Sequence, residues 1–140
     1  MAETVSHRCS LRVRYADTDQ MQFVYNGKYL EYFEVGRTEL IRACGMSYAE
    51  FEDDGTYLPL IEAHCNYHIP ARYDDMLTIV SELREMPRAT MRIDYEVIRE
   101  EPFARIASGY TIHAFLDKHT GRPKRPPRRF LEVMGFLQEK

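Results

Sequence analysis

The chain has 140 residues, 44% of them hydrophobic, which is enough for one compact domain with a core and leaves little for a second. We therefore expect residues 1–140 to form a single domain. The net charge of −3 argues against a generally basic nucleic-acid-binding protein. Three cysteines without a close-spaced pair suggest neither a disulfide framework nor a zinc site.

The N-terminus has no apolar stretch of signal-peptide length, and the chain has no run of about 20 apolar residues. We therefore expect a cytoplasmic protein that does not bind a membrane. We also expect no metal ion or cofactor. His64 and His68 lie four apart in a predicted strand, on one face, without a third ligand in view.

The first predicted strand begins near Val5 and continues through Leu11 and Val13. It ends near Tyr15, because residues 16–19 (ADTD) are a cluster of turn-forming residues. The candidate catalytic residues begin at this turn.

A long amphipathic helix is predicted over residues 29–44, where apolar or small residues recur at spacings of three and four. Asn26 is expected to cap its N-terminus and Gly45 to end it. Gly36, in its middle, costs about 1 kcal/mol against alanine. We interpret this glycine as a sign of close approach to another backbone. A shorter helix is predicted over residues 47–54 and closes at Gly55.

Four strands follow, over residues 57–68, 76–83, 89–98 and 105–116. The third alternates between apolar and charged residues, as in a half-buried antiparallel strand. In the fourth we expect one side to carry Ile106, Tyr110, Ile112 and Leu116. An amphipathic helix is predicted over residues 127–138. The connections between these strands are too short for helices, so the prediction is an α+β fold with a mainly antiparallel sheet.

Two motifs resemble those of a known family. The first is RYADTDQM at residues 14–21, followed by VY at 24–25, YLEYFE at 29–34 and RTE at 37–39; the second is PARYDDML at 70–77. With these motifs the chain resembles the hydroxybenzoyl-CoA thioesterase family of hotdog-fold proteins. The resemblance implies a five-stranded antiparallel sheet wrapped around a long central helix. It also implies a homodimer with active sites at its interface, often paired further into a homotetramer.

The family's catalytic aspartate corresponds to Asp19. The resemblance implies that this carboxylate attacks a thioester directly or activates water as a general base. From the residues alone, Asp17 and Asp19 are equally explained as turn formers. Many relatives carry a histidine where this chain has Asn26. The helix N-terminus around Asn26, Gly27 and Lys28 is expected to supply backbone N–H groups to an oxyanion hole.

Substrate binding is assigned to Tyr25 and Lys28 at the helix start and to Arg88, Lys124 and Arg125. Tyr25, Tyr29, Tyr57 and Phe23 are expected to line an acyl pocket, or else to be ordinary core residues. The three other cations are expected to bind the phosphates of CoA; the alternative is a solvated charged surface. Residues 118–129 carry six basic and no acidic residues, which favours a local anion site.

The function predicted is therefore hydrolysis of an acyl-CoA thioester to free acid and CoA. One alternative is a thioesterase for acyl groups on acyl carrier protein, whose acidic surface suits residues 118–129. Another is a non-catalytic acyl-binding module, because fold does not fix function. Nucleic-acid binding is not expected, because the basic cluster lacks interleaved aromatic residues. A homo-oligomer is expected, since a small domain often needs a second copy to complete its cleft.

Overall fold

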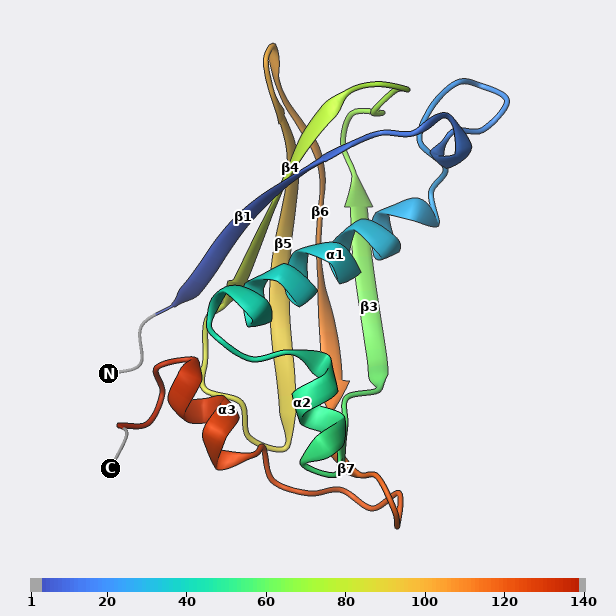
Figure 1. Cartoon of the computed structure of the whole chain (residues 1–140). Helices are drawn as coiled ribbons and strands as arrows, with labels where there is room; N and C mark the ends of the chain where they lie inside the picture. The colour runs from blue at the N-terminus through green and yellow to red at the C-terminus, as the bar shows by residue number, and fades with distance from the viewer. Residues whose placement is uncertain (1–3, 139–140) are drawn as a thin grey trace.

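The computed structural model describes residues 4–138 and contains one five-stranded antiparallel sheet (Figure 1). Its strand order is β1-β4-β5-β6-β3. The strands are β1 (Val5–Arg12), β4 (Met76–Leu83), β5 (Thr90–Glu100), β6 (Phe103–Ala114) and β3 (Leu60–Tyr67). The long helix α1 (Lys28–Ala43) crosses one face of this sheet, so the predicted α+β architecture is confirmed.

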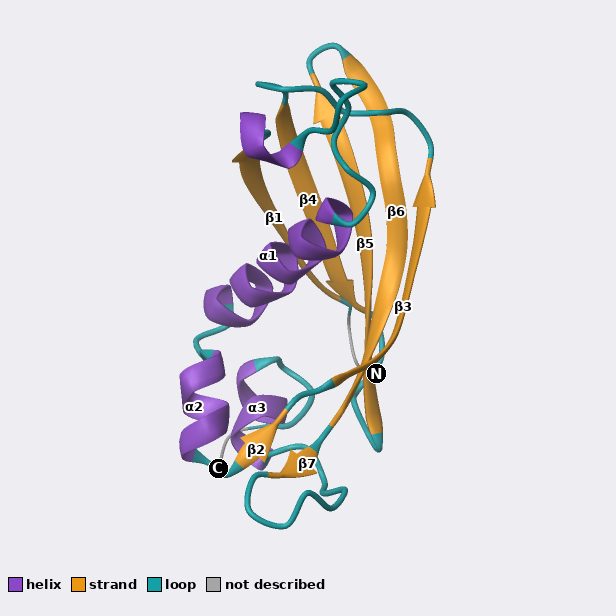
Figure 2. Ribbon diagram, turned by 90° about the vertical axis from the view of Figure 1, so that its right-hand side faces the viewer, coloured by secondary structure: helices purple, strands orange, loops and turns teal. Residues whose placement is uncertain are grey.

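The short elements lie at the two ends of the sheet. At one end are α2 (Tyr48–Asp53), α3 (Arg128–Val133) and a ribbon of β2 (Thr56–Tyr57) paired with β7 (Leu116–Asp117). At the other end the loop between β1 and α1 contains the short 3₁₀ helix η1 (Tyr15–Asp17), as Figure 2 shows. Among the described residues, no helix combines the length and the apolar character that a membrane crossing requires.

The start of α1 differs from the prediction. Its N-cap is Gly27, with helical backbone angles and no side-chain capping bond, so the expected capping role of Asn26 is wrong. A backbone turn takes that role, since Lys28 N–H donates to Tyr25 O at 2.9 Å and Tyr29 N–H to Asn26 O at 3.4 Å. At the other end Gly45 follows the helix with φ of +104°, which confirms it as the C-terminal stop.

Gly36 packs directly against strand β4 of the sheet. A β-carbon there would lie 2.6 Å from Ile79 Cγ2 and closer still to Ser81 Oγ, both on β4. Close packing at this glycine is therefore confirmed, but the neighbours are side chains rather than a backbone. The core lies between α1 and the sheet, where Phe33 stacks on Tyr95 with ring centroids 4.3 Å apart.

The predicted alternation of β5 is confirmed, with Met91, Ile93, Tyr95 and Val97 all buried. The pattern predicted for β6 is wrong. Val97 pairs with Ala107 but Ile98 with Arg105, so the register shifts at Ile106. A bulge of one residue exchanges the faces of everything that follows.

Beyond this bulge Thr111 and His113 face the core. Tyr110 lies on the outer face, where its ring stacks on that of His64. Ile112, two residues further on, shares that face, and Leu116 belongs to the separate strand β7. The predicted strand 57–68 is likewise two strands, because residues 58 and 59 interrupt it.

Candidate active site

The loop between β1 and α1 carries Asp19 and is held by backbone bonds rather than by a core of its own. Thr18 and Val24 form an antiparallel bridge, and Asp19 N–H donates to Phe23 O at 2.8 Å. Val24 N–H donates to Ala71 O at 2.9 Å, which joins this loop to the second family motif. The two motifs, about 50 residues apart in the sequence, therefore form one structural unit.

The carboxylate of Asp19 has a fixed orientation. Its Oδ1 accepts hydrogen bonds from Met21 N–H at 2.9 Å and Phe23 N–H at 3.3 Å. Among residues 4–138, no donor is bonded to Oδ2. One oxygen is therefore anchored to the backbone, and the other keeps its lone pairs for a reacting group.

Asp19 lies between two cavities. One has a volume of about 260 Å³ and places Asp19 and Asn26 beside a wall of mostly apolar residues, which are Met21, Phe23, Val24, Tyr29, Tyr67, His68, Ile69 and Pro70. The other, of about 500 Å³, is more polar and is lined by Tyr15, Thr18, Asp19, Gln20, Gln22, Arg72 and Tyr73. A carboxylate at the boundary of an apolar and a polar cavity can face an acyl group and water together.

Two backbone N–H groups at the start of α1 have no acceptor among the described residues. Neither Asn26 nor Gly27 donates its N–H to an acceptor within the described part of the chain. The N–H of Lys28 is already bonded to Tyr25 O. Of the three N–H donors expected at the helix start, only those of Asn26 and Gly27 therefore remain available, and Asn26 also lines the smaller cavity.

The structure does not bring the side chains of Tyr25 and Lys28 into either cavity. Tyr25 is exposed, and its ring lies over Gly27, where a β-carbon would be 3.1 Å from Cε2. Lys28 Nζ lies 3.2 Å from Glu31 and 3.8 Å from Asp17. Both residues therefore shape the helix start instead of facing the cavity.

Asp17 supports the loop from inside and is buried. Its carboxylate accepts bonds from Arg14 N–H at 3.1 Å, from the Arg14 guanidinium at 3.1 Å and from Tyr32 Oη at 3.0 Å. Burial alone would raise the pKa of Asp17, but these bonds outweigh it and hold the pKa below its ordinary value. Asp17 is therefore a charged anchor for the loop that presents Asp19.

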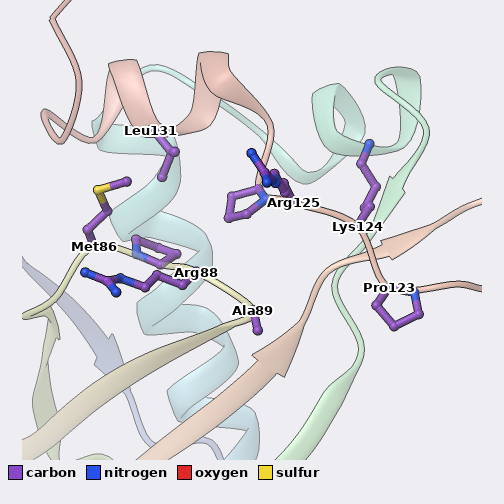
Figure 3. Close-up of a pocket in the computed structure, with 9 residues that line it drawn as sticks. Met86, Arg88, Ala89, Pro123, Lys124, Arg125 and Leu131 are labelled. Atoms are coloured by element: carbon purple, nitrogen blue, oxygen red, sulfur yellow. The ribbon is translucent and has the colours of Figure 1, made fainter.

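The predicted phosphate-binding residues lie at the other end of the sheet. Arg88, Lys124 and Arg125 line a cavity of about 560 Å³ (Figure 3) between the start of β5 and α3. Lys124 points away from Arg88 in this view, and its Nζ is bonded to Thr56 Oγ1 at 2.8 Å. Arg88 and Arg125 form no ion pair with residues 4–138, so they are the cations available to an anion there.

Several cavity residues were not predicted as part of the site. Tyr67 and the segment 68–70 form the second wall of the smaller cavity and lead into the matched motif at 70–77. Their position beside that motif was the one feature of the sequence that could have identified them as cavity residues. Of the four aromatic residues expected in an acyl pocket, Phe23 and Tyr29 line this cavity, whereas Tyr57 lies in β2 at the far end. Within residues 4–138, no three metal-ligating side chains converge.

Comparison with known proteins agrees with this geometry. Residues 13–134 match the family model of the thioesterase-like superfamily. A putative esterase from Aquifex aeolicus is 32% identical over 88% of this chain and 93% of its own length. The acyl-CoA thioester hydrolase YbgC of Escherichia coli O6:H1 is 30% identical over 70% of this chain and 73% of its own.

A solved 4-hydroxybenzoyl-CoA thioesterase superposes with a TM-score of 0.84 over 93% of this chain and 99% of its own, at 19% identity. This likeness concerns the fold and confirms the predicted hotdog architecture. The match to the family model extends over most of the chain and includes both motifs that meet at Asp19. The chain therefore belongs to the thioesterase-like superfamily.

Proposed function

We propose that this protein is an acyl-CoA thioesterase, acting as one domain, with Asp19 as its catalytic carboxylate. The observation that carries the proposal is the placement of Asp19, which lines a cavity together with Asn26 and whose Oδ2 accepts no hydrogen bond from residues 4–138. A carboxylate and free N–H groups are the two components that acyl transfer needs, an attacking or activating group and a site for the developing oxyanion. The names of similar proteins, such as the E. coli acyl-CoA thioester hydrolase, support the same substrate class.

In this proposal the acyl group occupies the smaller cavity with its carbonyl oxygen toward the N–H groups of Asn26 and Gly27. Asp19 Oδ2 then takes a proton from water that attacks the carbonyl, or attacks the carbonyl itself to form a mixed anhydride. The polar cavity on the other side of Asp19 supplies the water. Losing one oxyanion donor typically costs about a hundred- to a thousandfold in rate, so the N–H groups matter as much as the carboxylate.

We further propose a homodimer formed through β3. This strand is an edge of the sheet and is almost entirely exposed, with Leu60, Ile61 and Tyr67 among its large apolar side chains. An exposed edge of eight residues is an open template for strand pairing. Antiparallel pairing of two β3 strands extends both sheets into one, and a second pairing of dimers gives the tetramer.

Such a dimer also explains why the basic cavity and the cavity at Asp19 lie at opposite ends of the sheet in one chain. Figure 1 shows α3 and the loop between β1 and α1 at these opposite ends. The Tyr67 end of β3 adjoins the Asp19 loop, and the Leu60 end adjoins α2 and β7. Antiparallel pairing therefore sets the Asp19 end of one protomer beside the Arg88 end of its partner. We propose that Arg88 and Arg125 bind CoA phosphates there, with a weaker contribution from Lys124. Three free cysteines fit a cytoplasmic location, which belongs to the same proposal.

The test is thiol release from short, long and aromatic acyl-CoAs by the wild type, Asp19→Asn and the control Asp53→Asn. Asp53 is an exposed acid of α2, at the far end of the sheet. We expect Asp19→Asn to lower kcat by about a hundredfold or more, with unchanged thermal unfolding, and the control to retain full activity. Full turnover in Asp19→Asn would overturn the role of this residue, and acyl-CoA binding without turnover in the wild type would favour the binding module.

Two further measurements address the dimer and the basic cavity. Light scattering should give the mass of a dimer or tetramer, and a monomer mass would contradict the shared site. Arg88→Ala should raise KM for acyl-CoA but not for a thioester of the same acid with a short, uncharged thiol. Equal losses with both substrates would contradict phosphate binding, whereas a salt-sensitive preference for acyl carrier protein would favour the alternative substrate.

A further inference from the structure

The side chain of Tyr67 joins the end of β3 to the start of α1. Its hydroxyl donates a hydrogen bond to the backbone carbonyl oxygen of Asn26, 41 residues earlier in the chain, with 3.4 Å between the two oxygen atoms. Its ring lies edge-on to that of Tyr29, with ring centroids 5.5 Å apart. Tyr67 and Asn26 also line the smaller cavity together with Asp19. The hydroxyl therefore contacts the residue at which we place the oxyanion donors.

The carbonyl oxygen of Asn26 receives two hydrogen bonds. The N–H of Tyr29 donates to it at 3.4 Å, so one bond comes from the helix and the other from the sheet. A carbonyl oxygen has two lone pairs, and the two donors use both. Tyr67 keeps its proton at neutral pH, because partial burial and the nearby Cys65 raise the pKa of its phenol above the ordinary value. The oxygen is therefore held from both sides.

The bond to Asn26 O acts on a backbone N–H group because a peptide unit is rigid. Asn26 O and the Gly27 N–H belong to one planar trans peptide. The Asn26 N–H belongs to the preceding peptide, so the angle between the two N–H groups depends on rotation about the Asn26 α-carbon, which the anchored oxygen restricts. A hydrogen bond to a carbonyl also polarises its peptide and strengthens the N–H as a donor. Neither N–H group donates to an acceptor within residues 4–138, so both are held in a fixed mutual orientation for a ligand.

Resting on the proposed function, we propose that Tyr67 is a positioning residue for the oxyanion hole. In this role it touches no reacting atom. Through Asn26 O it fixes and polarises the peptide between Asn26 and Gly27, so that their N–H groups meet the carbonyl oxygen of the thioester as negative charge develops on it. Asp19 promotes attack on the carbonyl carbon, whereas Tyr67 acts on the carbonyl oxygen.

A packing role for Tyr67 predicts a different result. Phenylalanine keeps the ring against Tyr29 and removes only the hydroxyl, so a residue that merely packs tolerates this change. Loss of the positioning bond lowers kcat and leaves KM nearly unchanged, because the oxyanion forms only in the transition state. It also acts only on an atom that accepts strong hydrogen bonds. Sulfur is a weak acceptor, so a dithioester, with C=S in place of C=O, gains little from the N–H groups.

The kinetic experiment compares the wild type, Tyr67→Phe and Tyr110→Phe on a thioester and a dithioester of the same acid and CoA. Tyr110 is the matched control, because its hydroxyl also donates to one acceptor, Glu62 at 2.6 Å, but on the outer face of the sheet. We expect Tyr67→Phe to lower kcat for the thioester about three- to tenfold, the range set by loss of one neutral hydrogen bond, and for the dithioester less than about twofold. KM should not change, and the control should retain both rates.

A nuclear magnetic resonance measurement tests the contact without any turnover. Asn26 and Gly27 form the one Asn-Gly pair in the sequence, so labelling asparagine with carbon-13 at the carbonyl and glycine with nitrogen-15 selects the signal of this peptide. We expect its carbonyl carbon and nitrogen shifts to move in Tyr67→Phe and to stay in place in Tyr110→Phe.

The outcomes separate this role from the proposed function. Unchanged shifts in Tyr67→Phe, full activity of that variant, or an equal loss of kcat on both esters each overturns the role of Tyr67 while leaving that of Asp19 intact. Absence of turnover in the wild type overturns the proposed function itself, and with it the catalytic part of this inference, whatever the shifts show.

Discussion

Replacing Gly36 by alanine tests the packing of α1 on β4 and should destabilise the protein, although alanine is the better helix former. The added β-carbon would lie 2.6 Å from Ile79 Cγ2 and closer to Ser81 Oγ. Ile79 is β-branched and stiff at χ1, so it gives way poorly. Overpacking of this kind costs up to about 3 kcal/mol, while removing a helical glycine returns about 1 kcal/mol. We therefore expect a net loss of about 2 kcal/mol.

Urea unfolding at one fixed protomer concentration measures this loss, because oligomer stability depends on concentration. A loss of about 2 kcal/mol corresponds to a decrease in Tm of about 8 °C for a chain of this size. The neighbouring Val35, exposed on α1, is the matched control, and Val35→Ala should stay within about 0.5 kcal/mol of the wild type.

A double-mutant cycle separates the two contacts. Ser81 Oγ is buried without a hydrogen-bond partner among the described residues, so Ser81→Ala should be nearly neutral by itself. In that background Gly36→Ala should cost about 1 kcal/mol less than in the wild type, because one of the two obstructing atoms is gone. A Gly36→Ala protein as stable as the wild type would refute the packing argument.

Two other predictions concern His113 and Gly109 of β6. Burial and the charge of Arg37 lower the pKa of His113 to about 4. Between this value and the ordinary pKa of 6.5, the imidazole is unprotonated in the folded protein but protonated in the unfolded chain. The contribution of unprotonated His113 to the free energy of unfolding is fully present above pH 6.5 and should fall by about 3 kcal/mol as the pH drops towards 4. Urea unfolding across this pH range should show a weaker dependence of the free energy of unfolding on pH in His113→Gln than in the wild type. The same pH dependence in both proteins would contradict the assignment. At Gly109 a β-carbon would overlap the carbonyl oxygen of His64, so Gly109→Ala should separate β3 from β6. It should cost about 3 kcal/mol and weaken the dimer in light scattering, whereas Ser108→Ala should do neither; an intact, stable dimer in Gly109→Ala would argue against the β3 interface.

Most of the fold could be predicted from the sequence because the relevant signals are local. The periodicity of residues 29–44 and the alternation of 89–98 each report one buried face. The exceptions arose where pairing with a neighbouring strand or the geometry of a backbone turn, rather than the residue pattern of the segment, decided the outcome. The bulge at Ile106 is set by pairing with β5 and turns Tyr110 to the outer face. Capping by Asn26 was plausible from its residue type, but the backbone turn from Tyr25 supplies the acceptors.

The site was predicted in part for the same reason. Asp19 was identified through its motif, and its position between two cavities agrees with the expected role, which still awaits experiment. Tyr25 and Lys28 were predicted to bind substrate at the helix start, but the structure places their side chains in neither cavity. Residues 67–70, which line the smaller cavity, were not predicted as part of the site, because nothing local reveals that the end of β3 adjoins the Asp19 loop.

The sequence by itself therefore determined the family, the α+β architecture and the acid on which the chemistry is proposed to depend. These follow from short motifs and from periodic patterns, both of which are contained within single segments of the chain. Only the tertiary structure decided which residues share a cavity with Asp19, and that Arg88 and Arg125 lie at the opposite end of the sheet. The physical reason is that strand order and register bring together residues about 50 positions apart, and no local pattern encodes those distances.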